Sequence, residues 1–392
     1  SSIAGLDGLG VAEKIRVGVI SAREAAEASI ASIEKLNGSI NAVGTPIFEQ
    51  ALARADAGLG NGPFAGVLIL LKDLLNYKGV RMTQGSRLMM QNVSDWTPPF
   101  VEALESAGVN ILGKANTPEF GLLATTESLA LGACHNPWNL EHSTGGSSGG
   151  SSAAVASGMV PLAQASDGGG SIRIPASCCG LFGLKPSRGK MKQTSLEPMP
   201  GDIGVRHVVS RSVRDSAMSL SITEENEPSA LLAPTGLVAG PSSKRLKIAF
   251  STKNYFGDEP DADVKAAIEE TAILCAHMGH EIIDVTAPVT GDEFIDRFLT
   301  IWASGPAQLK ALVEQQTGKP AEEAGLLEPW TLGLADFFNA KPADALATAI
   351  AYFAEVTNQM TAWFADYDVW LSPVLNSAPP KLGEQSPEAP FE

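Results

Sequence analysis

Two glycine- and serine-rich stretches lie close together in the middle of the chain. The first reads Gly145-Gly146-Ser147-Ser148-Gly149-Gly150-Ser151-Ser152, and the second reads Asp167-Gly168-Gly169-Gly170-Ser171-Ile172-Arg173. The first stretch runs directly into small apolar residues at 153–156, which predict a helix and argue against a flexible linker. A Walker phosphate-binding loop is excluded as a motif match, because neither stretch ends in Gly-Lys-Ser/Thr.

The first stretch also contains the pattern G-x-S-x-G at residues 145–149. In many hydrolases this pattern forms a turn that presents a nucleophilic serine, and a strand leads into that turn. We expect no strand over residues 136–142, so we disfavour this match. It leaves one alternative open, a histidine-dependent esterase that uses Ser147.

The second stretch places three glycines before Ser171. Glycines allow backbone conformations in which successive N–H groups point to one spot and form an anion-binding nest. A serine hydroxyl beside such a nest suits acyl transfer, because the N–H groups stabilise the oxyanion that forms when the serine attacks a carbonyl. The alternative, a tight structural turn with Ser171 as a cap, is equally compatible with this loop alone.

The segments around these stretches alternate between strand and helix patterns. An apolar run at residues 67–71 predicts a buried strand that ends at Lys72 and Asp73, and residues 100–108 and 109–113 predict a helix and a strand. Later, residues 246–250, 263–278 and 281–285 predict a βαβ unit, and residues 368–372 a last strand. We therefore expect an α/β fold with a mixed central β-sheet flanked by helices on both sides.

A capping box at Ser21 and Glu24 predicts an amphipathic helix that extends to Leu36 and is ended by Asn37-Gly38. The chain shows no clear interdomain linker, and residues 233–243 are a loop-rich crossing between two halves. We expect a single domain over residues 1–392. It would have a helical N-terminal part at about 1–60, a catalytic core at about 62–215 and a C-terminal part at 245–392.

A nucleophilic serine needs a base, and no histidine is well placed to be one. The five histidines are His135, His142, His207, His277 and His280. A lysine can serve when burial lowers the pKa of its amine. Lys72 becomes a candidate because it follows an apolar strand, although a lysine at a strand end is by default a surface charge.

Composition excludes several classes of protein. The 392 residues carry 28 Lys and Arg against 44 Asp and Glu, a net charge of −16, which disfavours nucleic acid as the main ligand. The four cysteines are too few for a disulfide framework, and Cys275 and His277 lack further ligands at metal spacing, so we expect no metal and no cofactor. We see no signal peptide and no membrane span, and we expect a cytoplasmic protein.

Several motifs together resemble the amidase signature family. Its lysine motif is similar to residues 62–73, and its flanking motifs are similar to residues 83–86, 116–120 and 136–139; the signature itself is similar to residues 145–189. The resemblance is strong from Ser21 to Asp215 and weak beyond. Leu68 stands where the family usually has proline. The family also continues for several tens of residues after Ser372-Pro373-Val374, so we expect the C-terminal part to be incomplete.

The resemblance implies a Ser-cisSer-Lys triad. By position, Ser171 would be the nucleophile, Ser147 the bridging serine at a cis peptide and Lys72 the base, with Ser148 as a competing choice for Ser147. The backbone N–H groups of Gly168, Gly169, Gly170 and Ser171 would form the oxyanion hole, and Asp167 and Arg173 would organise their loop.

Within the family, the lysine strand and residues 136–139 look closest to bacterial amidases that act on aryl acylamides or 6-aminohexanoate oligomers. The implied activity is hydrolysis of the C–N bond of a small, apolar or aryl acylamide through an acyl-enzyme, in a protein that could form a homodimer. Two alternatives remain: a glutamine-hydrolysing subunit of a tRNA amidotransferase, and a non-catalytic homologue that only binds a ligand.

Overall fold

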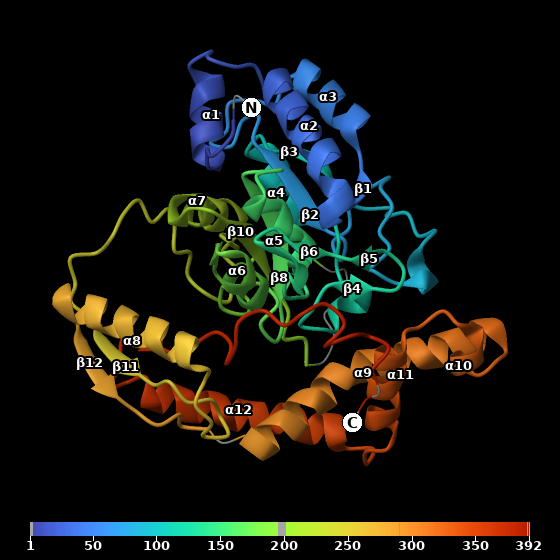
Figure 1. The fold of residues 1–392 in the computed structure, drawn as a ribbon, viewed down its shortest axis with the longest axis vertical. Coiled ribbons are helices and arrows are strands. Elements are labelled where there is room, and N and C mark those ends of the chain that lie inside the picture. Colours follow the sequence, from blue (N-terminus) through green and yellow to red (C-terminus); the bar gives the residue numbers. More distant parts are fainter. Residues whose placement is uncertain (1–2, 195–200, 290, 390, 392) are drawn as a thin grey trace. The chain divides into compact units, whose positions relative to one another are not determined.

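The computed structural model of this chain describes residues 3–194, 201–289, 291–389 and 391. Its internal contacts divide the chain into two units, which we describe separately (Figure 1). Unit 1 comprises Ser1–Gly240 with Pro379–Ala389, and unit 2 comprises Pro241–Ala378 with Phe391. The boundary falls within the loop-rich crossing predicted at residues 233–243. The single domain over residues 1–392 stays a prediction.

Unit 1 is built around a six-stranded mixed sheet with the strand order β1-β3-β2-β8-β10-β9. Strands β2, β3 and β8 are parallel, whereas β1 and β10 run antiparallel to their neighbours. The strands of the sheet are β1 (Val43–Pro46), β2 (Leu68–Lys72), β3 (Asn110–Ala115), β8 (Leu162–Asp167), β9 (Phe182–Gly183) and β10 (Val205–Ser210). This confirms the predicted mixed α/β fold.

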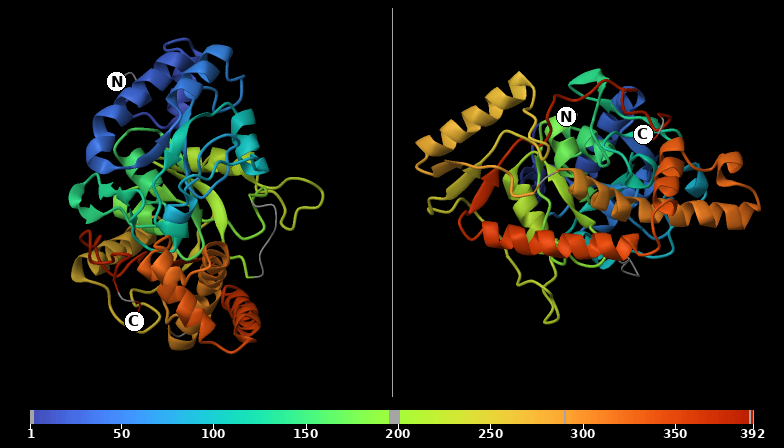
Figure 2. Two further views of the ribbon diagram at one scale, coloured as in Figure 1. Left: turned by 90° about the vertical axis from the view of Figure 1, so that its right-hand side faces the viewer. Right: turned by 90° about the horizontal axis from the view of Figure 1, so that it is seen from below.

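Helices pack on this sheet, and their place can be followed by colour in Figure 2. The helices that contact its strands are α2 (Ala22–Ile40), α3 (Phe48–Ala57), α5 (Gly149–Ala156), α6 (Arg173–Cys179) and α7 (Val213–Thr223), and the helices that contact α7 are α1 (Gly8–Arg16) and α4 (Pro99–Ser106). All five residues of β2 are completely buried, which shows that both faces of this central strand are covered. An uninterrupted apolar run is what such a strand requires.

Two small hairpins complete unit 1. Strand β4 (Glu127–Ser128) pairs with β5 (Gly132–Ala133), and β6 (His135–Asn136) pairs with β7 (Asn139–Ser143). The expectation of no strand over residues 136–142 was therefore wrong. The reason is that β7 belongs to a two-stranded hairpin with polar and mostly exposed residues, so it lacks the apolar pattern of a core strand.

Helix α2 begins as predicted but ends later. The reciprocal bonds of the capping box are present between Ser21 and Glu24. The helix continues through Asn37 and Gly38 to Ile40, because Asn41 rather than Asn37 takes the left-handed conformation, with φ 55°, that closes the last turn. The side chain of Asn37 instead bonds to the backbone of Val43 beyond the helix.

Helix α5 starts with two glycines because its first turn is packed against neighbouring atoms. A Cβ on Gly149 would lie 2.2 Å from Oγ1 of Thr126, and a Cβ on Gly150 would lie 2.4 Å from the backbone nitrogen of Asn116. Any side chain at these positions would collide with its surroundings. The glycines therefore allow the chain that leads out of Ser147 to enter the interior of unit 1.

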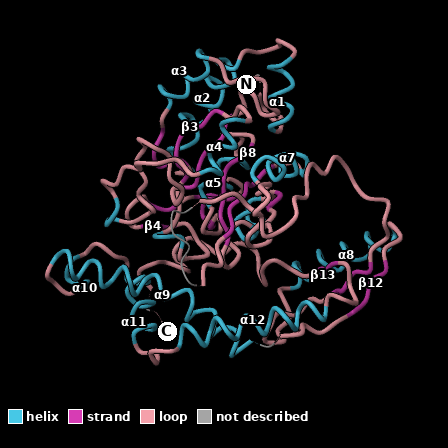
Figure 3. The backbone as a smooth tube through the Cα atoms, turned by 180° about the vertical axis from the view of Figure 1, so that it is seen from behind, coloured by secondary structure: helices cyan, strands magenta, loops and turns pink. Residues whose placement is uncertain are grey.

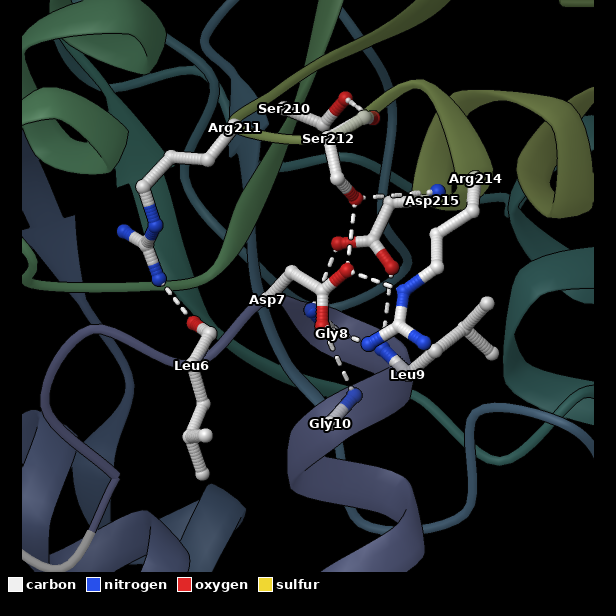
Figure 4. Close-up of polar contacts among 10 residues, drawn as sticks. All are labelled: Leu6, Asp7, Gly8, Leu9, Gly10, Ser210, Arg211, Ser212, Arg214 and Asp215. Carbon is white, nitrogen blue, oxygen red and sulfur yellow. Dashed lines mark hydrogen bonds and ion pairs between the residues drawn. The ribbon is translucent and has the colours of Figure 1, made fainter.

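The N-terminal segment is attached to the β10–α7 connection by a network of polar contacts (Figure 4). Asp215 accepts hydrogen bonds from the backbone N–H groups of Gly8 at 2.6 Å and Leu9 at 2.9 Å, at the first turn of α1. Asp7 in turn forms an ion pair with Arg214 and accepts a bond from Ser212, which caps α7. The first turn of α1 is thus stabilised by Asp215 of α7. In return, Ser212 at the start of α7 bonds to Asp7 at the start of α1.

Unit 2 contains the predicted βαβ unit in a three-stranded parallel sheet with the order β12-β11-β13. In the view of Figure 3 its strands and helices are separated by colour. Its elements are β11 (Lys247–Phe250), α8 (Ala262–His277), β12 (Glu281–Asp284), α9 (Gly291–Thr317), α10 (Ala321–Ala324), α11 (Pro329–Asn339), α12 (Ala345–Trp363) and β13 (Val369–Leu371). Helices α10, α11 and α12 pack against α9.

Candidate active site

The side-chain amine of Lys72 lies in the interior of unit 1. Lys72 is the last residue of β2 and has no solvent exposure. Its Nζ lies 2.7 Å from Oγ of Ser147 and 3.0 Å from Oγ of Ser166. Burial lowers the pKa of Lys72 well below 10.5, the cation of Arg206 lowers it further, and Asp167 partly opposes both. A neutral amine in this position can accept a proton from a hydroxyl group.

Ser147 lies in the turn that connects β7 to α5. It follows a cis peptide bond after Gly146, as the family resemblance implies, and its carbonyl oxygen accepts a hydrogen bond of 3.0 Å from Oγ1 of Thr117. Its side chain is 2% exposed. The hydroxyl group of Ser147 therefore reaches an amine, and among the described residues no histidine ring is bonded to it.

Ser148, the competing choice for the bridging serine, has different contacts. Its hydroxyl donates to the carbonyl oxygen of Ser166 at 3.1 Å and accepts from the backbone N–H of Ser166 at 3.2 Å. Its backbone N–H donates to the carbonyl oxygen of Ser171 at 3.2 Å. Ser148 thus links α5 to the backbone of β8 and of the loop after it, while Ser147 contacts Lys72.

Ser171 lies in the loop between β8 and α6 and is 7% exposed. Since β2 and β8 are parallel, their C-terminal ends meet at one edge of the sheet, where Lys72 ends β2 and Asp167 ends β8. Across the described part of the chain, the hydroxyl of Ser171 has no hydrogen-bond partner, Ser147 included. It is free to turn toward a substrate or toward Ser147.

Asp167 holds the glycine loop in shape. Its Oδ1 accepts from the backbone N–H of Gly170 at 2.8 Å, its Oδ2 accepts from Ile172 at 3.1 Å, and Arg173 forms an ion pair with it at 2.9 Å. Burial alone would raise the pKa of Asp167, but these donors outweigh burial and hold the pKa below 3.8. The carboxyl group is thus an anion that fixes the loop.

The predicted oxyanion donors differ in availability. The N–H of Gly170 is already bonded to Asp167. The N–H groups of Gly168, Gly169 and Ser171 have no acceptor within the described residues. These three are the donors that a developing oxyanion could use.

A second buried lysine lies on the neighbouring strand. Lys114 of β3 is completely buried and donates to the carbonyl oxygen of Leu75. Burial lowers its pKa to about 8, although the nearby carboxyl group of Asp73 raises it. Asp73 accepts from the backbone N–H of Thr83 at 3.1 Å, and burial raises its pKa. Lys114, through Leu75, and Asp73, through Thr83, thus each hold part of the chain that leaves β2 after Lys72.

Four of the five histidines have partners other than the two serines. His135 bonds to the carbonyl oxygen of Leu140, His142 to that of Pro379, and His280 accepts from the backbone of Leu246. His207 is buried against Ser216. In the residues that the structure describes, no group of three His, Cys, Asp or Glu side chains could hold a metal ion.

Ser166 and Arg206 were not predicted. The alternation of side chains along a strand puts Gln164 and Ser166 on the same face of β8. Which face meets Lys72 follows only from the pairing of β8 with β2, and the place of Arg206 follows from its pairing with Ser166 in β10. Both pairings join segments far apart in the sequence, so no local signal reveals them.

No helix of the described residues combines the length and apolar character needed to cross a membrane.

The chain matches the family model described as Amidase over residues 24–391. It is 36% identical to a 6-aminohexanoate-cyclic-dimer hydrolase of Pseudomonas sp. (strain NK87), over 96% of this chain and 79% of that protein. The structure resembles that of a 6-aminohexanoate cyclic dimer hydrolase complexed with substrate, with a TM-score of 0.86, 32% identity, and coverage of 96% of this chain and 81% of that one.

It also resembles the structure of a bacterial aryl acylamidase of the amidase signature family, with a TM-score of 0.87, 25% identity, and coverage of 97% of this chain and 82% of that one. The family predicted from the motifs is thus confirmed. This protein is a member of the amidase family of amide-bond hydrolases.

Proposed function

We propose that this protein hydrolyses the C–N bond of a small amide through an acyl-enzyme on Ser171, with Lys72 as base and Ser147 as the bridge between them. The observation that carries the proposal is the completely buried amine of Lys72, 2.7 Å from the hydroxyl of Ser147. A lysine in water would be protonated at neutral pH and could not act as a base. Burial lowers the pKa of Lys72, so the amine can be neutral and accept a proton.

In the first step Ser171 attacks the amide carbonyl carbon and its proton passes to Ser147, whose own proton passes to Lys72. The carbonyl oxygen becomes an oxyanion, which the N–H groups of Gly168, Gly169 and Ser171 stabilise. Loss of one such donor costs roughly 3–4 kcal/mol in comparable enzymes. The protonated relay then returns a proton to the amine nitrogen, the C–N bond breaks and the acyl group stays on Ser171.

In the second half the same relay accepts a proton from water while the water oxygen attacks the acyl carbon. The bond between that carbon and Oγ of Ser171 then breaks, the relay returns the proton to Oγ of Ser171, and the carboxylic acid is released. The hydroxyl groups of Ser147 and Ser171 are not hydrogen-bonded to each other in the structure, so the relay requires a rearrangement that brings them together. Catalytic hydrogen bonds often tighten only when substrate is bound.

For the substrate, we propose a small, apolar or aryl acylamide, linear or cyclic. The curated relative and one of the two solved structures are named for the cyclic dimer of 6-aminohexanoate, the other structure is named an aryl acylamidase, and the chain spans about four-fifths of each of the three. The cytoplasmic location and the homodimer remain predictions.

The test is a panel of an anilide, a linear aliphatic amide, the 6-aminohexanoate cyclic dimer and glutamine, combined with labelling by a fluorophosphonate. We expect labelling on Ser171, turnover of at least one of the first three amides, and loss of both in Ser171→Ala. Ser152→Ala is the matched control, because Ser152 is a buried serine of the same stretch whose hydroxyl has no hydrogen-bond partner among the described residues.

Full turnover by Ser171→Ala would refute the proposal. Labelling of Ser147 would favour the histidine-dependent esterase, exclusive turnover of glutamine would favour the amidotransferase subunit, and a protein that is neither labelled nor active would be the ligand-binding homologue.

A further inference from the structure

Arg206 enters unit 1 on the same face of the sheet as the proposed base. In the antiparallel pairing of β10 with β8, Arg206 lies opposite Ser166. Residues directly opposite each other in such a pair project their side chains from the same face. The hydroxyl of Ser166 lies 3.0 Å from Nζ of Lys72. Arg206 therefore leaves the sheet toward the side that holds the Lys72 amine.

The guanidinium group extends toward the nucleophile loop. A Cβ on Gly204 would lie 2.6 Å from Nη1 of Arg206, so the side chain folds back over Gly204 toward the start of β10. At that end of the pairing, Val205 lies opposite Asp167, the last residue of β8. The loop that carries Ser171 begins directly after Asp167. The cation of Arg206 is thus aimed at the edge of the sheet where the reaction is proposed.

Among the residues that the structure describes, this cation has no partner. Within residues 3–194, 201–289, 291–389 and 391, no carboxylate lies at ion-pair distance from Arg206 and no hydrogen bond of its side chain is found. Two other arginines of unit 1 have carboxylate partners: Arg173 pairs with Asp167, and Arg214 pairs with Asp7. Burial lowers the pKa of Arg206, and the nearest opposing charge is that of Asp202.

Arg206 is only partly exposed, and an unpaired cation that has lost much of its contact with water is costly to the fold. The cost is explained if a ligand supplies the missing anion. A guanidinium group presents planar pairs of N–H donors that match the two oxygens of a carboxylate. Asp202 carries the nearest opposing charge, but it forms neither an ion pair nor a hydrogen bond with Arg206, and its Oδ1 instead accepts from the backbone N–H of Gly204 at 2.8 Å.

We propose that Arg206 forms an anion subsite beside Ser171 that binds a carboxylate carried by the amide substrate. This rests on the proposed function, and it narrows the substrate class to amides with a carboxylate a few atoms from the scissile bond. The carboxylate can belong to the acyl part or to the amine part, and the experiment includes both.

The test compares charged and uncharged substrates of similar shape. For the acyl part the pair is glutaryl p-nitroanilide and pentanoyl p-nitroanilide, and for the amine part it is 4-acetamidobenzoate and acetanilide. Loss of the Arg206 cation also acts on the pKa of Lys72 and so on both members of a pair, which makes the ratio between the two members the readout. In Arg206→Gln we expect the ratio of kcat/KM for the charged member to that for the uncharged member to fall about tenfold to hundredfold in one pair, the usual range for a lost charged hydrogen bond.

Two further variants test the position of the Arg206 guanidinium group and the general effect of losing one positive charge. Gly204→Ala keeps the cation but displaces Nη1, and we expect it to reduce the preference for the same charged substrate. Arg188→Gln removes a positive charge from an exposed position, and we expect it to leave both pairs unchanged.

Unchanged preference in Arg206→Gln for both pairs would overturn the subsite. An equal fall for charged and uncharged substrates, with a shifted pH profile, would also overturn it and show that Arg206 acts through Lys72. Turnover of the uncharged substrates by Arg206→Gln demonstrates that the variant is folded. The proposed function fails separately, if wild type hydrolyses none of the four amides or if Ser171→Ala hydrolyses them normally.

Discussion

Replacement of Lys72 by methionine tests whether the buried amine is neutral in the folded protein. Methionine has a similar length and no charge, and the site has no solvent exposure. Because the pKa of Lys72 is lowered well below 10.5, the unfolded chain binds one more proton than the folded chain at every pH between the two pKa values. The free energy of unfolding of the wild type must therefore rise with pH across this interval.

The size of the effect follows from one proton. Its contribution to the free energy of unfolding rises by about 1.4 kcal/mol per pH unit in the interval and is absent in Lys72→Met. The variant also loses the bonds to Ser147 and Ser166, each contributing roughly 1 kcal/mol. That loss shifts the whole curve without changing its slope, so the slope reports the charge alone.

The assay is urea unfolding of both proteins at about pH 9 and about pH 10 at one salt concentration. The stability of wild type relative to Lys72→Met should increase by about 1.4 kcal/mol over this step. Lys78→Met, which removes an exposed lysine, controls for the general loss of one charge. Parallel curves for wild type and Lys72→Met would mean that the amine is charged when buried, and the proposed base would be refuted.

Two further predictions concern buried titratable groups away from Lys72. Burial lowers the pKa of His207 from 6.5 to about 4. The free energy of unfolding of the wild type should therefore fall by about 3 kcal/mol as the pH falls through that interval, whereas that of His207→Gln should not. Equal losses for both proteins in urea unfolding at acid pH would contradict this prediction. Asp215→Ala leaves the N–H groups of Gly8 and Leu9 without their acceptor, which should lower the free energy of unfolding by about 2–4 kcal/mol. The amides of α1 should then exchange with solvent before those of β2. Unchanged protection of α1 in the variant would show that the contact is dispensable.

The fold was predictable where the pattern was local and strong. The apolar run that forms β2 and the βαβ unit of β11, α8 and β12 were identified from the sequence, with boundaries that differ by one or two residues. The end of α2 was missed because Asn37-Gly38 resembles a stop signal, while the left-handed turn forms at Asn41. Strand β7 was missed because it has no apolar face.

The candidate site was predictable mainly through resemblance to a family. Residue chemistry alone left Ser171 as either a nucleophile or a turn residue, and Lys72 as either a base or a surface charge. The contact between Lys72 and Ser147 joins residues 75 positions apart and depends on the pairing of strands. The same dependence hid Ser166 and Arg206, whose neighbours are set by the register of β10 on β8.

The tight packing around Gly149 and Gly150 has a consequence for how members of this family are recognised. The atoms that would collide with a side chain there belong to Thr126, Thr144, Asn116 and Ala42, and none of these is a proposed reacting group. A descendant that had lost its chemistry would still need both glycines in order to fold. Pattern searches keyed on them will therefore retrieve pseudoenzymes alongside working hydrolases, and the distinction depends on residues 72, 147 and 171.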